Sequence, residues 1–282
     1  MIGFTGSPLD RADALRLDEA ALADLAARDD ARLLRLEGLD PVIGDDGKLL
    51  WSPLAPEGPL IFLGLEGGAP RFAPLSEDAP GKPAFALFAA IAAMRPADAA
   101  IWAAARSVNE WHARHRYCGR CGAWAEPFRG GWGRRCTGCA AEHFPRVDPV
   151  VIMLAEHDGR VLLGRQHHYP PRRYSALAGF VEPGESIEEA VARELREEAG
   201  IEVRDVVYFA SQPWPFPGQL MIACIAQAAS GELVLDEAEL DHAIWASRDE
   251  VRQALAGDPA AAFIGPPAFA IAHSLLAHWA GA

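Results

Sequence analysis

The stretch from Gly179 to Ile201 reads GFVEPGESIEEAVARELREEAGI and carries a glycine loop followed by a short acidic helix. Its glutamates Glu194, Glu197 and Glu198 are spaced i, i+3 and i+4, so the three carboxylates share one helix face and repel one another. A bound divalent cation removes that repulsion, and hard carboxylate oxygens favour Mg²⁺ or Mn²⁺, which also bind substrate phosphates. The stretch therefore predicts a metal site suited to diphosphate chemistry. The alternative is a solvated acidic face, which is common in a chain of net charge −13.

Local signals set where this helix begins, where it ends and which face it buries. Ser186 and Glu189 form an S-x-x-E capping box, which starts a helix. The Pro183-Gly184 turn precedes the box, and Gly200 stands where a C-cap glycine belongs. The apolar stripe that would pack against a core consists of Ile187, Ala190, Val191 and Leu195. These signals leave the carboxylates on the polar edge of a packed helix and favour the metal site over a solvated face.

The same stretch matches the pattern G-x5-E-x7-R-E-U-x-E-E-x-G-U, in which U is aliphatic, at every defined position. The matching residues are Gly179, Glu185, Arg193, Glu194, Leu195, Glu197, Glu198, Gly200 and Ile201. This pattern resembles the Nudix box of hydrolases that cleave a nucleoside diphosphate linked to another moiety. The resemblance implies an α/β/α sandwich with a mixed sheet and catalysis with divalent metals.

The resemblance also implies roles for the acidic residues of the box. Glu194 and Glu198 resemble metal ligands, and Glu197 resembles a ligand or a water-activating group. Arg193 and Glu185 resemble an ion pair that orients the other carboxylates.

Four of the five cysteines form two C-x2-C pairs that are 14 residues apart. They are Cys118, Cys121, Cys136 and Cys139. Two such pairs present four soft thiolates to a structural Zn²⁺, as in a zinc ribbon. Redox-active pairs or two disulfides are the alternatives, and a cytosolic chain disfavours stable disulfides. His112 and His115, just upstream, are either alternative ligands or ordinary polar positions on a helix that leads into the ribbon.

The segment from Ser211 to Met221 reads SQPWPFPGQLM and contains three prolines in five residues. Because proline fixes φ and removes a backbone donor, we expect Trp214 and Phe216 to lie on a stiff loop rather than on a strand. Rigid aromatic rings near a phosphate-cleaving site suit the stacking of a flat base. The alternative is a kinked loop whose aromatic rings pack in the core.

This segment downstream of the box, with the four-cysteine ribbon upstream, resembles the NADH pyrophosphatase subfamily, also known as NAD-capped RNA hydrolases. The implied substrate contacts are Phe144, Phe180, Gln212, Pro213, Trp214, Pro215, Phe216, Pro217, Gly218, Gln219 and Ala272. Phe144 and Phe180 resemble a pair that stacks on the nicotinamide end, although the subfamily often has tyrosine at the first position. The backbone carbonyl of Ala178 and the carboxylate of Glu239 resemble further metal ligands. The lead-in to the box departs from the usual pattern and leaves the roles of Arg172 and Arg173 open.

The resemblance implies hydrolysis of the pyrophosphate bond of NADH or NAD⁺, which gives AMP and reduced or oxidised nicotinamide mononucleotide. The same cut would remove the NAD cap from RNA 5′ ends. A general Nudix hydrolase of ADP-ribose or other nucleoside diphosphate derivatives is one alternative. An RNA-binding module with a scaffold Nudix fold is another, although a scaffold has no need of every acidic position. A homodimer is implied by the resemblance alone.

Composition limits the other classes of protein. No run of about 18 apolar residues and no signal sequence stand out in the 282 residues, so we expect a soluble, cytoplasmic chain with no membrane partner. The 39 acidic residues outnumber the 26 basic ones, which excludes indiscriminate binding to nucleic acid. A local basic patch at residues 129–135, RGGWGRR, remains compatible with this balance.

The order of these features predicts an α/β protein with three parts. A small α/β domain spans residues 1–110, the zinc ribbon spans 111–146, and the Nudix domain spans 147–282. We expect helices over 18–36, 84–94, 97–115, the box and 269–279. We expect strands over 48–51, 60–65, 147–157, 160–166, 220–228 and 242–247. Strands on both sides of the box helix favour a mixed sheet covered by helices.

Overall fold

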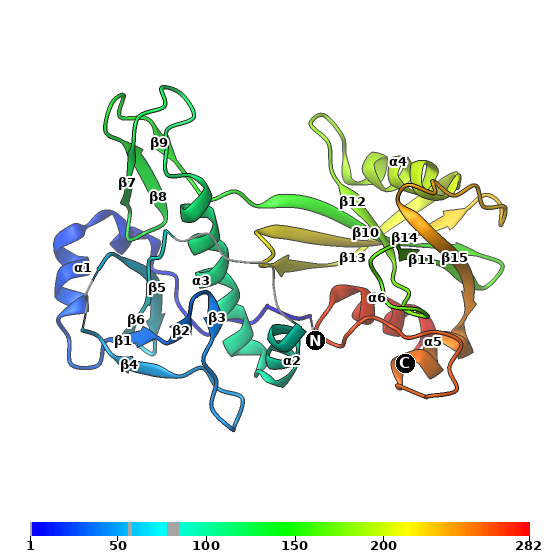
Figure 1. The fold of residues 1–282 in the computed structure, drawn as a ribbon, viewed down its shortest axis with the longest axis horizontal. Coiled ribbons are helices and arrows are strands. Elements are labelled where there is room, and N and C mark those ends of the chain that lie inside the picture. The colour runs from blue at the N-terminus through cyan, green and yellow to red at the C-terminus, as the bar shows by residue number, and fades with distance from the viewer. Residues whose placement is uncertain (1, 56–57, 78–84) are drawn as a thin grey trace. The chain divides into compact units, whose positions relative to one another are not determined.

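A computed structural model describes residues 2–55, 58–77 and 85–282 (Figure 1). The chain forms two units. The C-terminal unit comprises Met1–Gly3, Asp148–Gln212 and Gln219–Ala282. The N-terminal unit comprises Phe4–Val147 and Pro213–Gly218. Across the described residues, none of the helices combines the length and apolar character needed to cross a lipid bilayer.

A six-stranded mixed sheet forms the centre of the C-terminal unit, with strand order β13-β14-β10-β11-β15 and β12 paired to β10. The strands are β10 (Asp148–His157), β11 (Arg160–Gln166), β12 (Leu177–Phe180), β13 (Val203–Trp214), β14 (Gln219–Ala228) and β15 (Leu240–Ser247). Strand β10 runs parallel to β14 and antiparallel to β11 and β12. The strands predicted over 147–157, 160–166, 220–228 and 242–247 are confirmed within two residues at their ends.

Three helices cover this sheet, namely α4 (Ile187–Ala199), α5 (Arg248–Leu255) and α6 (Ile271–Ala280). Because side chains alternate along β10, Val151 and Met153 pack in one core with Leu195 of α4. Ile152 and Leu154 point to the opposite face and share a second core with α5 and α6. The helices therefore lie on both faces of the sheet, which confirms the α/β/α sandwich (Figure 1).

The proline-rich segment differs from its prediction. Strand β13 continues through Gln212 and Pro213 to Trp214, and residues 215–218 form the turn into β14. Strand β13 is at the edge of the sheet, where proline is tolerated because its missing N–H need not serve a second neighbour. The expectation that Trp214 lies on a loop was therefore wrong, whereas Phe216 does lie in the turn.

The N-terminal unit contains a four-stranded sheet of order β4-β1-β6-β5 and a separate β2-β3 pair. Its strands are β1 (Arg32–Leu34), β2 (Leu36–Glu37), β3 (Asp40–Pro41), β4 (Trp51–Pro53), β5 (Leu60–Glu66) and β6 (Ala69–Pro74). Its helices are the 3-10 helix η1 (Asp13–Leu17), α1 (Glu19–Ala26), α2 (Phe85–Ala93) and α3 (Pro96–Arg114). Pro96 occupies the first turn of α3, as proline prefers.

Two predictions in this unit need correction. Asp18 caps α1 as expected, but the helix ends at Ala26 and not at Leu36, because Arg32–Leu34 pairs as β1 between β4 and β6. The strand expected over 48–51 begins only at Trp51. The strand expected over 60–65 is confirmed as β5, and α3 confirms the helix over 97–115 within one residue. The helix over 84–94 matches α2, although its first position, Ala84, lies outside the described residues.

The ribbon segment folds within the N-terminal unit as three short antiparallel strands that follow α3. They are β7 (Ala125–Phe128), β8 (Gly133–Cys136) and β9 (Glu142–His143). Strand β8 is central and pairs with β7 on one side and with β9 on the other. Strand β7 follows the first cysteine pair, and the second pair connects β8 to β9.

Two helices of the C-terminal unit begin with the same reciprocal cap. Ser186 and Glu189 close the capping box of α4, and Ser247 and Glu250 close that of α5. We expect Ser186→Ala and Ser247→Ala each to lower the free energy of unfolding by about 1 kcal/mol, because each leaves a helix N–H without its acceptor. Urea unfolding of the two variants measures this. Only α4 carries the acidic cluster, so we expect Ser186→Ala to lower the activity that depends on this cluster more than Ser247→Ala does. Equal activity losses in both variants would contradict this expectation.

Candidate metal centre and active site

Helix α4 holds two of the box carboxylates in buried positions. The relative exposure is 9% for Glu194 and 4% for Glu198, whereas the Glu197 side chain is exposed. Gly179 of β12 explains how Glu194 fits. A Cβ at position 179 would lie 1.9 Å from Cδ of Glu194, so only glycine lets this carboxylate rest against the strand. Gly179 at the start of the box and Glu194 on its helix are thus in direct packing contact.

Arg193 is the cation that ties the carboxylates together. Its guanidinium forms a bidentate pair with Glu185, with Nε to Oε1 at 2.6 Å and Nη2 to Oε2 at 2.9 Å. It also donates to Glu194 at 2.8 Å, to Glu197 at 3.0 Å and to the Phe180 carbonyl at 2.8 Å. The bidentate bond from Arg193, followed by a bond from the Glu182 backbone N–H, lowers the pKa of Glu185 to about 2. The ion pair expected between Arg193 and Glu185 is present and fixes the start of α4 to the end of β12.

Glu198 is a buried carboxyl with further carboxylates around it. Burial, followed by the charges of Glu194, Glu239, Asp236 and Glu197, raises the pKa of Glu198 to about 8. Burial also raises the pKa of Glu194, against the opposing bond from Arg193. Glu239 acts on both residues, so the segment before β15 brings its carboxylate to the same cluster. Two buried carboxyls, Glu194 and Glu198, beside exposed carboxylates that repel them have the donor chemistry that a hard divalent cation satisfies.

The loop before β15 is fastened to the box helix through its backbone. The Asp236 N–H donates to the Glu198 carbonyl at 3.0 Å, and the Glu239 N–H donates to the Asp236 carbonyl at 3.1 Å. His167 adds a ring-nitrogen contact of 2.9 Å with the Glu237 carbonyl. Sequence reasoning placed Glu239 near the site only by resemblance, and it missed Asp236. The acidic run from Asp236 to Glu239 was the available signal.

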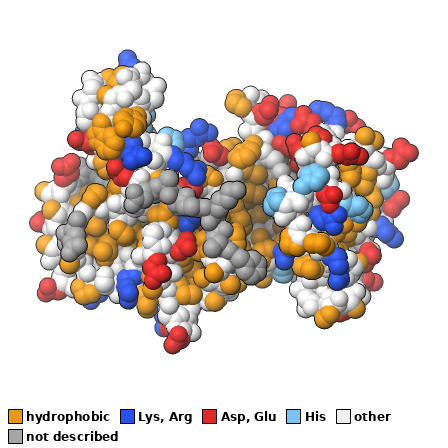
Figure 2. Space-filling view, viewed as in Figure 1, with side chains coloured by type: hydrophobic (Ala, Val, Ile, Leu, Met, Phe, Trp, Pro, Cys, Tyr) orange, Lys and Arg blue, Asp and Glu red, His pale blue; other side chains and the backbone are white. Residues whose placement is uncertain are grey.

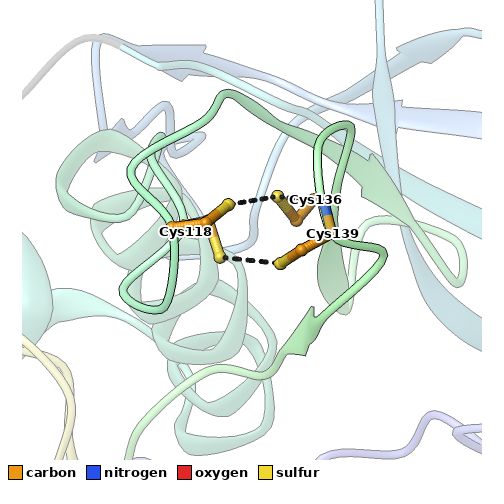
Figure 3. Close-up of side chains that lie close together, drawn as sticks. Cys118, Cys136 and Cys139 are labelled. Atoms are coloured by element: carbon orange, nitrogen blue, oxygen red, sulfur yellow. Dashed lines mark hydrogen bonds between the residues drawn. The ribbon is translucent and has the colours of Figure 1, made fainter.

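Four thiols make up the second metal-binding group. The sulfur atoms of Cys118, Cys121, Cys136 and Cys139 lie within 4.8 Å of one another. Figure 3 labels three of these side chains, which lie close together. Backbone N–H groups of Arg120 and Gly138 donate to Cys118 and Cys136 at 3.4 and 3.3 Å. The four cysteines form a zinc ribbon. Among the described residues, no group of carboxylates is clustered as tightly as these four thiols.

The histidines near the ribbon have other partners. His112 is fully buried between the Gly131 carbonyl at 2.8 Å and Arg134 at 3.1 Å, and burial lowers its pKa to about 4. His115 contacts the Trp111 carbonyl at 2.9 Å. His143, which the spacing did not reveal, brings Nε2 to 3.2 Å from the Cys118 sulfur. The candidate zinc ligands are therefore the four cysteines, without His112 or His115.

Gln212 has a structural place at the start of α6. Its side-chain nitrogen donates to the carbonyls of Gly3 and Phe269 at 3.0 and 2.7 Å, and its oxygen accepts from the Ile271 N–H at 2.8 Å. Residue Ala270 at the N-cap has no side chain that could provide this bond. Gln212 is thus a cap supplied from a distant strand, and its predicted substrate contact stays a prediction.

The aromatic rings of the proline-rich segment pack within the N-terminal unit. Phe216 lies 5.6 Å from Phe88 and 6.2 Å from Trp102, measured between ring centroids. Trp214 lies 5.4 Å from Phe216, and Arg106 donates from Nε to the Pro215 carbonyl at 3.1 Å. This is the core-packing alternative for the two rings. A substrate contact by residues 212–219 stays a prediction.

The other predicted substrate residues differ in accessibility. Phe144 and Phe180 are both exposed, and Phe144 lies 6.0 Å from Phe128. Phe180 ends β12, and its carbonyl accepts from Arg193. Ala272 instead lies in the core between α6 and the sheet. The two phenylalanine rings are therefore available for stacking, and the contact by Ala272 stays a prediction.

Arg172 and Arg173, whose roles the sequence left open, fasten the lead-in of the box to residues 261–265. The Arg172 side chain donates to the Ala261 carbonyl, and the Ile264 N–H donates to the Arg172 carbonyl at 2.7 Å. Arg173 donates to the Gly265 carbonyl at 3.3 Å. Both arginines thus hold backbone groups of the C-terminal unit.

Comparisons with known proteins agree with this arrangement. Residues 145–264 match the NUDIX domain, and residues 113–144 match the NADH pyrophosphatase zinc ribbon domain. NAD-capped RNA hydrolase NudC of Mycobacterium bovis is 40% identical over 292 residues, which cover 96% of this chain and 92% of that protein. The chain belongs to the Nudix hydrolases that carry an NADH pyrophosphatase zinc ribbon.

Other similar proteins overlap less of their own length. NAD-capped RNA hydrolase NUDT12 of Homo sapiens is 44% identical over 200 residues, 67% of this chain, and the match spans only 43% of that relative. Among solved structures, a NUDIX hydrolase from Nitrosomonas europaea aligns with 59% of this chain and 90% of its own, with 22% identity and a TM-score of 0.48.

The raised pKa of Glu198 predicts a loss of stability with pH in protein without added divalent cation. The folded state keeps its proton up to about pH 8, whereas the unfolded state loses it near 4.5, so stability falls between these values. From about pH 7 to about pH 8.5 we expect the free energy of unfolding to fall by about 1 kcal/mol. This pH range lies above the pH at which His112 titrates in either state. Urea unfolding measures it. Glu198→Gln should flatten this pH dependence, and an unchanged slope in that variant would assign the effect elsewhere.

Gly179→Ala tests the packing of β12 on Glu194. The added Cβ would displace the Glu194 carboxylate, which is the flexible end of a side chain, so we expect the fold to persist while cation-dependent activity falls at least about tenfold. Gly58→Ala is the matched control because no atom of the described residues lies within 4 Å of a Cβ there. Thermal unfolding and steady-state kinetics of both variants provide the measurement, and full activity in Gly179→Ala would refute the packing argument.

Proposed function

We propose that this chain is a metal-dependent hydrolase of the pyrophosphate bond of NADH and NAD⁺, and that the same cut removes the NAD cap from RNA 5′ ends. The products would be AMP, or a 5′-monophosphate RNA, together with nicotinamide mononucleotide. The observation that carries the proposal is the buried carboxylate cluster of Glu194 and Glu198 on a complete Nudix box. The zinc ribbon family and the similarity to NAD-capped RNA hydrolases support the nicotinamide dinucleotide as substrate.

The cluster would hold Mg²⁺ or Mn²⁺ through Glu194, Glu197, Glu198 and Glu239, together with the Ala178 carbonyl. When bound, such ions neutralise charge on phosphate oxygens and lower the pKa of a coordinated water. The support is the donor set, since all these groups present hard oxygen atoms and the two buried carboxyls have raised pKa values. The zinc of the ribbon has a separate, structural role.

The protein residues supply proton transfer and positioning. Glu198 has a pKa near 8 without a cation and is then protonated at neutral pH; a bound cation would lower this pKa, so that its carboxylate would serve as a metal ligand or accept a proton from the attacking water. Arg193 keeps the Glu194 and Glu197 carboxylates in place through its bonds to both and to Glu185. These bonds restrict the motion of the carboxylates and so hold them in a defined geometry for the reaction.

By family resemblance, substrate recognition would use Phe144 and Phe180 to stack on the nicotinamide ring; each of the two rings is exposed. The phenylalanine at position 144 has no hydroxyl, so its contribution is stacking without a hydrogen bond. Residues 212–219 and Ala272 complete the proposed contacts by family resemblance. The same resemblance supports a cytoplasmic homodimer and the division into domains 1–110, 111–146 and 147–282.

Two other functions make different demands on these residues. A general Nudix hydrolase of ADP-ribose would need the same carboxylates but no nicotinamide-stacking pair. An RNA-binding scaffold would need neither, and burying repelling carboxylates without a cation costs stability, which disfavours a purely structural role for the cluster.

The proposal is tested by the kinetics of one isosteric substitution. We expect Glu198→Gln to lower kcat for NADH hydrolysis about 10²- to 10⁴-fold, because the amide is neither a base nor an anionic ligand. Glu188→Gln, an exposed position on the same helix, should retain activity. Rates for NADH, NAD⁺ and ADP-ribose measured with the same enzyme decide the substrate. Unchanged activity in Glu198→Gln would refute the role, and preference for ADP-ribose would favour the general hydrolase.

A further inference from the structure

The zinc ribbon has a charge opposite to that of the chain as a whole. Residues 113–146 contain seven arginines and two glutamates, a formal charge of +5, whereas the complete chain has −13. A zinc held by four thiolates adds two negative charges, which still leaves the segment positive. A basic segment in an acidic chain is the electrostatic footprint of a polyanionic partner.

Two arginines next to the first cysteine pair are available for such a partner. Arg116 and Arg120 are exposed, and neither guanidinium has a hydrogen bond or ion pair within the part of the chain that the structure describes. Other ribbon arginines do have acidic partners, such as Arg135, which bonds Glu142 at 2.9 Å. The positive charge that is not neutralised therefore lies around residues 116–124, which we call the first knuckle.

The same knuckle presents two large aromatic rings to solvent. Tyr117 is 65% exposed and Trp124 is 38% exposed, although both residues are anchored by pairing with each other. Their ring centroids lie 5.6 Å apart at 82°, and the guanidinium of the buried Arg134 lies 5.2 Å from the Trp124 ring. Hydrophobic and basic side chains lie together over the ribbon strands (Figure 2). The rings are thus held firmly while a face of each remains accessible.

We propose that the first knuckle binds the single-stranded RNA that follows a 5′ NAD cap, with Tyr117 and Trp124 stacking on bases and Arg116 and Arg120 contacting phosphates. Exposed aromatic rings beside arginines are the combination that binds single strands without a sequence preference. A duplex hides the faces of its bases, and an acidic peptide has no flat rings to stack. The inference rests on the proposed function, and it assigns to the ribbon the distinction between capped RNA and free dinucleotide.

RNA binding is measured without catalysis, by fluorescence anisotropy of a short, 3′-labelled single-stranded RNA that has no cap. Arg116→Ala/Arg120→Ala should weaken binding and reduce the slope of log K against log salt by about 1.4, since each of the two lost phosphate contacts accounts for about 0.7. Tyr117→Ala should weaken binding at least about fivefold. Arg204→Ala/Arg252→Ala and Tyr208→Ala, which remove exposed residues of the same types from the C-terminal unit, are the matched controls.

Kinetics with two substrates complete the test. In the knuckle variants we expect kcat/KM for NAD-capped RNA to fall at least about fivefold, while NADH hydrolysis and zinc content stay at wild-type values. Equal RNA binding by wild type and knuckle variants would overturn the proposal. So would equally tight binding of an RNA duplex, or competition by polyglutamate as effective as that by RNA. If wild type cleaves neither substrate, the proposed function fails, and the anisotropy still decides whether the knuckle binds RNA.

Discussion

The burial of like charges on one face of α4 is the constraint on which the rest of the site depends. Two carboxylates with almost no exposure, Glu194 and Glu198, cannot both be charged in a low-dielectric setting without compensation. The fold supplies part of it through Arg193, whose guanidinium reaches Glu185, Glu194 and Glu197. None of these bonds from Arg193 reaches Glu198, and burial raises the pKa of Glu198. The unneutralised charge is therefore localised where a cation would be held.

Local sequence signals defined this helix because each of them acts within a few residues. The Ser186–Glu189 capping box, the αL glycine at 200 and the buried stripe around Leu195 all involve the helix itself, and all are present as predicted. The Arg193–Glu185 pair also joins neighbours in sequence. The Nudix box could be located and oriented from the sequence because its stabilising contacts are short-range.

Long-range contacts account for what the sequence did not predict. The helix expected to reach Leu36 ends at Ala26, since pairing of β1 with β4 and β6 outweighs the helix propensity of an Ala/Leu-rich stretch. Gln212 caps α6 from 59 residues away, and His143 approaches Cys118 from 25 residues away. Trp214 lies on an edge strand because the sheet order, invisible in the sequence, leaves its proline neighbours without a second partner.

The two proposed binding sites would use opposite electrostatic arrangements for partners that both carry phosphates. Around Glu198, an excess of negative charge excludes an anionic substrate unless a divalent cation stands between them. On the ribbon, the guanidinium groups of Arg116 and Arg120 can attract phosphates without any mediator. Binding of the reacting phosphates would therefore require the cation. Attraction of a polynucleotide to the ribbon would instead vary with the salt concentration alone. If one surface bound both the cation and the RNA, its arginines would repel the cation and its carboxylates would repel the RNA. Placing the two sites on separate segments of the chain avoids both repulsions.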